Sequence, residues 1–130
     1  MFTKMSKCIT MNMNPFIIFL DIDRVLTTPL SNYQKCDYGC ISCMNTIVHN
    51  YQQVKFVLIS FRDYDEVQDL LSRAGFAGKI IDDVYRNNPG GSVFVGRTKE
   101  AAITEWLQFN PTYDYLIIDD SQFTFESVCP

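Results

Sequence analysis

Two patterns of apolar residues divide the chain. Short, nearly unbroken apolar runs have the length and composition of strands that are covered on both faces. They occupy residues 16–21, 55–60, 79–85 and 113–119, and residues 93–95 form a shorter candidate. Since parallel sheets bury both of their faces, these runs predict a mostly parallel sheet.

Apolar residues also recur at helical spacing in three segments between the strands. These segments are residues 41–51, 63–75 and 98–110. Asp63 and Thr98 are suited to cap the second and third helices, because their side-chain oxygens can accept from backbone N–H groups. Strands and helices therefore alternate, which predicts an α/β domain with a Rossmann-like parallel sheet flanked by helices.

Polar and turn-rich segments separate these elements at residues 27–39 and 86–92, and residues 120–130 are expected to be loop. Residues 1–15 are interpreted as an N-terminal lead-in. The remaining residues, 16–130, are expected to form one domain, which is usual for a chain of 130 residues.

Composition and charge narrow the classes of function. The chain is 47% hydrophobic and 20% charged, which is typical of a globular protein. Its net charge is −4 and its pI is about 4.8, without a basic patch, so no nucleic-acid partner is expected. No apolar run reaches the roughly 20 residues of a membrane span. The N-terminus lacks a secretory signal, and the five cysteines are an odd number, so a cytoplasmic location is expected.

Acidic and hydroxyl side chains follow three of the predicted strands. Asp21 and Asp23 follow the first, Ser60 ends the second, and Asp119 and Asp120 end the last. Sites in open α/β sheets form outside the carboxyl ends of the strands, so these groups are expected to converge. Gathered carboxylates need a cation, and hard oxygen ligands favour Mg²⁺.

Four segments resemble the ordered motifs of the haloacid dehalogenase-like (HAD) phosphatase superfamily. DIDRVL at residues 21–26 matches its signature of two aspartates, VLIS at 57–60 its second motif, and LIID with a following Asp at 116–120 its fourth. Lys99, which precedes an amphipathic helix, resembles the cationic residue of the third motif, and Arg97 is the alternative for the same role. The set spans residues 16–120.

The resemblance implies a role for each matched residue. Asp21 would be the nucleophile and a Mg²⁺ ligand, and Asp23 the general acid and base whose backbone carbonyl also binds the metal. Ser60 would hydrogen-bond the transferred phosphoryl group, and Lys99 would neutralise its charge. Asp119 and Asp120 would complete the metal site; which of the two binds directly stays open.

The stretches around SFRDY and KEAAITEWL are most similar to small HAD domains of some bacterial and RNA-repair-associated proteins. Those domains often read SWR at the second motif, so Phe61 departs from the pattern and Arg62 keeps it. Arg62 could therefore bind phosphate or substrate. Arg24 replaces the glycine that commonly follows the second aspartate, and it either takes a conformation that suits glycine or adds a cation at the mouth of the site.

The spacing of the motifs leaves no room for a cap domain. Asp23 and Ser60 are separated by 36 residues, and Ser60 and Lys99 by 38. Capless relatives act on macromolecules, so the resemblance favours a phosphoprotein phosphatase, with phosphotyrosine among its candidate substrates. A small-molecule or phosphoinositide phosphatase is the alternative, as is a bacterial effector that is delivered into a host cell.

Two further interpretations stay open. A HAD module that has lost catalysis could bind phosphate only. The spacing of Cys36, Cys40 and Cys43 is that of an iron–sulfur cluster in radical enzymes, but those enzymes need a larger barrel than this chain provides. We therefore expect the three cysteines to be small, half-buried residues at the start of a helix, and His49 to lie on the outer side of that helix or to pack as an ordinary residue.

Overall fold

The computed structural model describes residues 15–85, 98–111 and 114–120. Within these ranges it forms one four-stranded sheet, three α-helices and one 3-10 helix. The elements in chain order are β1 (Phe16–Leu20), η1 (Pro29–Ser31), α2 (Tyr38–Asn50), β2 (Val54–Leu58), α3 (Tyr64–Arg73), β3 (Ile80–Asp83), α5 (Lys99–Phe109) and β4 (Asp114–Ile118).

The sheet is parallel throughout, with the strand order β3-β2-β1-β4. β1 is central because its apolar run is buried on both faces, which suits an inner strand. Its last residue, Leu20, lies opposite Leu58 of β2 and Ile118 of β4. The carboxyl ends of these three strands are therefore level, and residues that follow them meet at one edge. The predicted Rossmann-like α/β fold is confirmed.

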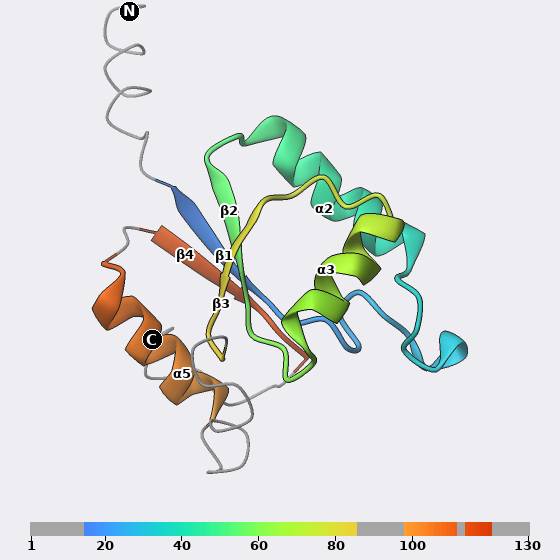
Figure 1. The fold of residues 1–130 in the computed structure, drawn as a ribbon. Helices are drawn as coiled ribbons and strands as arrows, with labels where there is room; N and C mark the ends of the chain where they lie inside the picture. Colours follow the sequence, from blue (N-terminus) through green and yellow to red (C-terminus); the bar gives the residue numbers. More distant parts are fainter. Residues whose placement is uncertain (1–14, 86–97, 112–113, 121–130) are drawn as a thin grey trace, which may run out of the picture.

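Helices cover both faces of the sheet, with α2 and α3 on one side and α5 on the other (Figure 1). Side chains alternate along a strand, so Ile18 and Leu20 pack toward α2 and α3 while Ile17 and Phe19 pack toward α5. Phe19 makes an edge-to-face contact with Trp106 of α5, at 5.4 Å between ring centroids. Burial of such an aromatic side chain stabilises the fold by about 1.5–3 kcal/mol.

Each α-helix begins at a polar cap. Asp37, Asp63 and Thr98 each accept a hydrogen bond from the backbone N–H three residues later, at 3.0–3.1 Å. The caps predicted at Asp63 and Thr98 are confirmed. The cap at Asp37 starts α2 at Tyr38, so the loop predicted for residues 27–39 is shorter than expected and also contains η1.

Both inner strands end earlier than the sequence predicted. β1 ends at Leu20 and β2 at Leu58, so Ser60 lies two residues beyond its strand. The predictions for the lead-in before residue 15, for residues 86–97 and for the tail after residue 120 lie outside the described residues. In the described ranges, no helix is long and apolar enough to cross a membrane.

Candidate active site

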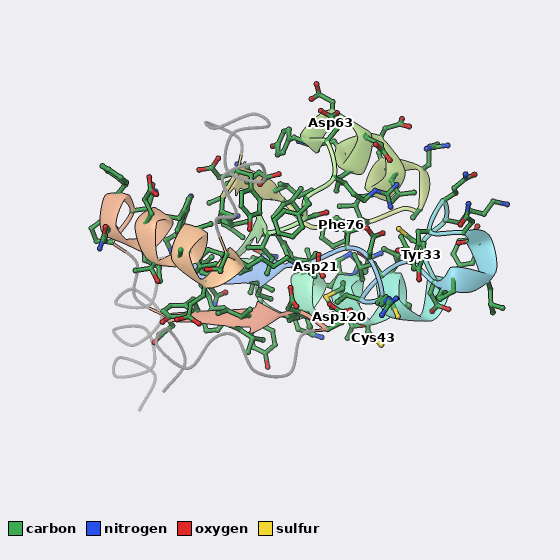
Figure 2. The ribbon with its side chains drawn as sticks, turned by 90° about the horizontal axis from the view of Figure 1, so that it is seen from below. Asp21, Tyr33, Cys43, Asp63, Phe76 and Asp120 are labelled. Atoms are coloured by element: carbon green, nitrogen blue, oxygen red, sulfur yellow. The ribbon has the colours of Figure 1, made fainter. Side chains whose placement is uncertain are left out.

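Three carboxylates meet where β1 and β4 end. The side-chain oxygens of Asp21, Asp119 and Asp120 come within 4.8 Å of one another, and Figure 2 shows Asp21 and Asp120 at the same end of the sheet. The pairing of the strands produces this cluster, since the Asp21 backbone N–H donates to the Ile118 carbonyl at 2.9 Å. The structure therefore brings together three of the acidic residues that the sequence singled out.

Lys99 forms ion pairs with two of the three carboxylates. Its Nζ lies 3.1 Å from Asp21 Oδ2 and 2.8 Å from Asp119 Oδ2. The side chains of Asp21 and Asp119 are buried, with exposed fractions of 7% and 1%, and that of Lys99 is half-buried at 14%. Lys99 reaches them because it is the first residue of α5, directly after the cap at Thr98.

Burial and neighbouring charges act in opposite directions on the pKa of Asp21 and on that of Lys99. Burial raises the pKa of Asp21 to about 6, against the lowering effect of Lys99. Burial alone would lower the pKa of Lys99, but the hydrogen bond to Asp119 and the charge of Asp21 outweigh it and raise that pKa. At neutral pH the pair is therefore an ionised carboxylate beside a protonated ammonium.

The donor set of this cluster fits a magnesium ion. It offers the buried carboxylates of Asp21 and Asp119 and that of the exposed residue Asp120, and Mg²⁺ takes a few such oxygens and keeps several waters. The ammonium of Lys99 shows that this position already accommodates positive charge. The carboxylate of Asp23 is not part of the three-residue group, so its predicted contribution to a metal would come only from its backbone carbonyl.

Ser60 lies at the same edge of the sheet, beyond β2. The backbone N–H of Ile59 donates to the Leu20 carbonyl at 3.1 Å, which extends the pairing of β1 and β2 toward the site. The side chain of Ser60 is buried, and its Oγ accepts from the backbone N–H of Arg62 at 3.1 Å. This bond holds the turn that follows β2.

Arg62 is held by the carboxylates of Asp23 and Glu66. Its Nη1 donates to Asp23 Oδ1 at 2.9 Å and to the Tyr33 carbonyl at 2.8 Å, and its Nη2 donates to Glu66 Oε1 at 2.5 Å. Burial opposes the charge of Arg62, but the bonds to Glu66 and Asp23 raise its pKa. Thr27 donates to the same Asp23 oxygen at 2.9 Å. Asp23 is therefore fixed by two donors.

Arg24 takes the backbone conformation that glycine usually takes at this turn. Its φ is 64°, in the left-handed region, where a side chain costs about 1–2 kcal/mol. A hydrogen bond with Tyr33 raises the pKa of Arg24, and the charge of Asp120 adds to this. Arg24 is exposed, so it adds a cation at the rim of the site.

The cysteines do not form a metal centre in the described part of the chain. Cys36 is buried, Cys40 is half-buried and Cys43 is exposed, and all three are free. The aspartate cluster is the one group of potential ligands found among these residues. Burial raises the pKa of the Cys36 thiol, which disfavours the thiolate that binds metals. His49 is exposed near the end of α2, as predicted.

Four residues around the site were not predicted from the sequence. Thr27 and Glu66 hold Asp23 and Arg62, the Tyr33 carbonyl accepts from Arg62, and the Phe61 ring lies 5.3 Å from Lys99 Nζ. The four-residue spacing of Arg62 and Glu66 at a helix start could have indicated their ion pair. Nothing in the sequence marks the carbonyl of Tyr33. Arg97, the alternative to Lys99, lies outside the described residues.

Comparison with known families places this site in context. Residues 17–129 match a family model described as the HAD domain in Swiss Army Knife RNA repair proteins. The chain belongs to this family. HAD domains are phosphatase-type hydrolases that typically use Mg²⁺, and the acidic cluster of this HAD domain could bind such an ion. No curated protein and no solved structure matches the chain.

Proposed function

We propose that the protein is a Mg²⁺-dependent phosphatase that hydrolyses phosphomonoesters through an aspartyl-phosphate on Asp21. The observation that carries this proposal is the position of Lys99, whose ammonium joins Asp21 to Asp119 beside Asp120. A buried nucleophile, a cation for the phosphoryl charge and a carboxylate cluster for a metal are the parts that phosphoryl transfer needs.

In the first step a carboxylate oxygen of Asp21 attacks phosphorus, and the bond from phosphorus to the leaving oxygen breaks. Asp23 gives its proton to that oxygen, which leaves as an alcohol. In the second step Asp23 takes a proton from water as the water oxygen attacks the phosphorus. The bond to Asp21 then breaks, inorganic phosphate leaves and the free carboxylate returns.

The surrounding residues stabilise these steps. Ser60 donates a hydrogen bond to the transferred phosphoryl group, and Lys99 offsets its negative charge. With its pKa raised to about 6, Asp21 is mostly ionised at neutral pH and can attack. Arg62 and Thr27 orient Asp23 toward the leaving oxygen. A magnesium ion held by Asp21, Asp119 and Asp120, with the Asp23 carbonyl, would supply further positive charge at the phosphoryl oxygens.

The substrate class we favour is a terminal phosphate of RNA, because the family description names RNA repair proteins. This proposal replaces the expectation, drawn from the net charge, that the chain has no nucleic-acid partner. The acidity of the chain limits how it would hold RNA. Proteins that grip the phosphate backbone do so with many cations, and this chain has a net charge of −4. We therefore expect binding to be confined to the terminal nucleotide, with a weak dependence on salt and on the length of the RNA.

A phosphoprotein is the second candidate. The described part of the chain holds no cap domain between Asp23 and Ser60, where only η1, α2 and β2 lie. An uncapped site would admit a phosphorylated side chain on a protein surface, phosphotyrosine included. A small-molecule or phosphoinositide substrate, a cytoplasmic location and delivery as an effector stay predictions.

A phosphatase screen tests the proposal. The purified protein is assayed with Mg²⁺ on an aryl phosphate, phosphopeptides, sugar phosphates, phosphoinositides and RNA with phosphorylated ends. Turnover should disappear with EDTA and in Asp21→Asn, while Asp69→Asn, which changes an exposed carboxylate on α3, should retain it. Metal-independent turnover, or full activity in Asp21→Asn, would refute the mechanism. Binding of Mg²⁺ and phosphate without turnover would identify an inactive HAD module instead.

A further inference from the structure

The ring of Phe61 lies exposed at the rim of the candidate active site. Phe61 directly follows Ser60, and 54% of its surface is exposed whereas only 2% of Ser60 is. Single exposed apolar residues are common on protein surfaces and need no functional reason. Phe61 differs from these because of what its ring touches.

Two contacts fix the ring beside the reacting groups. Its centroid lies 5.3 Å from Lys99 Nζ, within cation–π range, and the same ammonium lies 3.1 Å from Asp21 Oδ2. The buried ring of Tyr85 supports Phe61 from the protein side, at 4.9 Å between centroids and 37° between planes. Lys99 is therefore the side chain that links the Phe61 ring to Asp21, while Tyr85 packs against the ring and its remaining surface is exposed to solvent.

Two described cations at the site are engaged by carboxylates, and a third, Arg24, is exposed at its rim. Lys99 contacts Asp21 and Asp119, and Arg62 contacts Asp23 and Glu66. Lys99 and Arg62 can stabilise the reacting phosphoryl group but offer little charge for the rest of a substrate. The exposed ring of Phe61 offers that remainder an apolar contact.

We propose that Phe61 determines substrate specificity by packing against the base of the nucleotide that carries the terminal phosphate. The inference rests on the proposed function, because it assigns the group next to the phosphate that Asp21 attacks. Every base has an aromatic face, so such a contact tolerates any sequence. Because Lys99 and Tyr85 cover part of the ring, we expect the contact to improve kcat/KM about five- to tenfold, near the lower end for base stacking.

Matched substrates measure this contact. Adenosine 5′- and 3′-monophosphates are compared with the corresponding methyl riboside phosphates, which keep the sugar and the phosphate but lack the base. The quantity measured is the ratio of kcat/KM with the base to kcat/KM without it. This ratio cancels any general loss of activity, such as one caused by a displaced Lys99.

Four variants give the readout. Phe61→Ala and Phe61→Leu should reduce the ratio about five- to tenfold, the second while keeping apolar volume at the position. Phe61→Trp should keep the ratio at or above its original value. Phe109→Ala removes a phenylalanine that is even more exposed, at the far end of α5, and should leave the ratio unchanged.

The outcomes separate this inference from the proposed function. A ratio that Phe61→Ala and Phe61→Leu leave unchanged, in an active phosphatase, overturns the inference alone. A ratio near one for the nucleotides, with a Phe61-dependent preference for phosphotyrosine over phosphoserine peptides, also overturns it and assigns the ring to a tyrosyl group. An absence of turnover on every phosphomonoester refutes both the inference and the proposed function.

Discussion

Replacement of Lys99 by methionine removes the positive charge between two buried carboxylates and keeps a side chain of similar length. Nζ lies 3.1 Å from Asp21 and 2.8 Å from Asp119. At an effective dielectric constant of about 20, each contact is worth about 5 kcal/mol of Coulomb energy. Part of this Coulomb energy offsets the cost of burying three charges. Removing one partner of a buried ion pair typically costs about 3–5 kcal/mol of stability. We expect the free energy of unfolding without metal to fall by about 3 kcal/mol at pH 8.

The loss should depend on pH, because Asp21 can take up a proton. Its pKa is already about 6, and without Lys99 it rises further, while in the unfolded chain it returns to about 3.8. Between these values the folded protein binds a proton that the unfolded chain does not. The stability of Lys99→Met therefore decreases as pH rises toward the raised folded pKa, and the deficit should be smaller at pH 6 than at pH 8.

Urea unfolding of the metal-free protein at pH 6 and pH 8 measures both effects. The control is Arg73→Met, which removes an exposed cation paired with Asp69 and should cost less than about 1 kcal/mol at either pH. In the same variant series kcat/KM should fall at least about 100-fold for Lys99→Met. A variant within about 0.5 kcal/mol of the parent at pH 8 would refute the reasoning, as would a deficit that grows toward pH 6.

Three further predictions concern neighbouring parts of the site. Mg²⁺ should raise the melting temperature of the parent protein, and Asp120→Asn should weaken this shift; equal shifts in a thermal melt would exclude Asp120 from the metal site. Arg62→Met should lower kcat more than it raises KM, because Asp23 loses its donor, and Arg62→Lys should recover part of kcat in steady-state assays; a pure change in KM would instead indicate substrate binding. Thr98→Ala should lose about 1 kcal/mol in urea unfolding and reduce activity through the first turn of α5, and unchanged values of both would show that the cap does not position Lys99.

The sequence predicted the sheet and the acidic edge because local patterns determine both. The apolar run of β1 and the aspartates directly after it are local features of the sequence. Once β1 and β4 pair in register, the aspartates that follow the two strands meet at one edge. Thr98 and Lys99 were likewise predictable, since a polar cap before an amphipathic helix fixes where the helix begins.

The sequence could not predict the contacts that depend on the path of a loop. Binding of phosphate or substrate by Arg62 stays a prediction, but its contacts with Asp23 and with the Tyr33 carbonyl, 29 residues away in the chain, were not predicted. The contact with Tyr33 requires the left-handed backbone at Asn32 and Tyr33, with φ of 53° and 60°. Neither residue is a glycine, which would have indicated this conformation in the sequence. The conformation of Arg24 was left open between two alternatives for the same reason.

The central position of β1 also determines when the protein acquires its site during synthesis. Asp21 leaves the ribosome early, but its partners Lys99 and Asp119 lie about 80 and 100 positions later in the chain. Since β4 pairs directly with β1, the first and last described strands must meet before the carboxylates and the ammonium come together. Such long-range pairing slows folding, so a nascent or truncated chain that lacks β4 would hold an unpaired β1 edge and no complete site. Recovery of activity after dilution from denaturant would accordingly report the closing of the β1–β4 edge together with the placement of Lys99 at the start of α5.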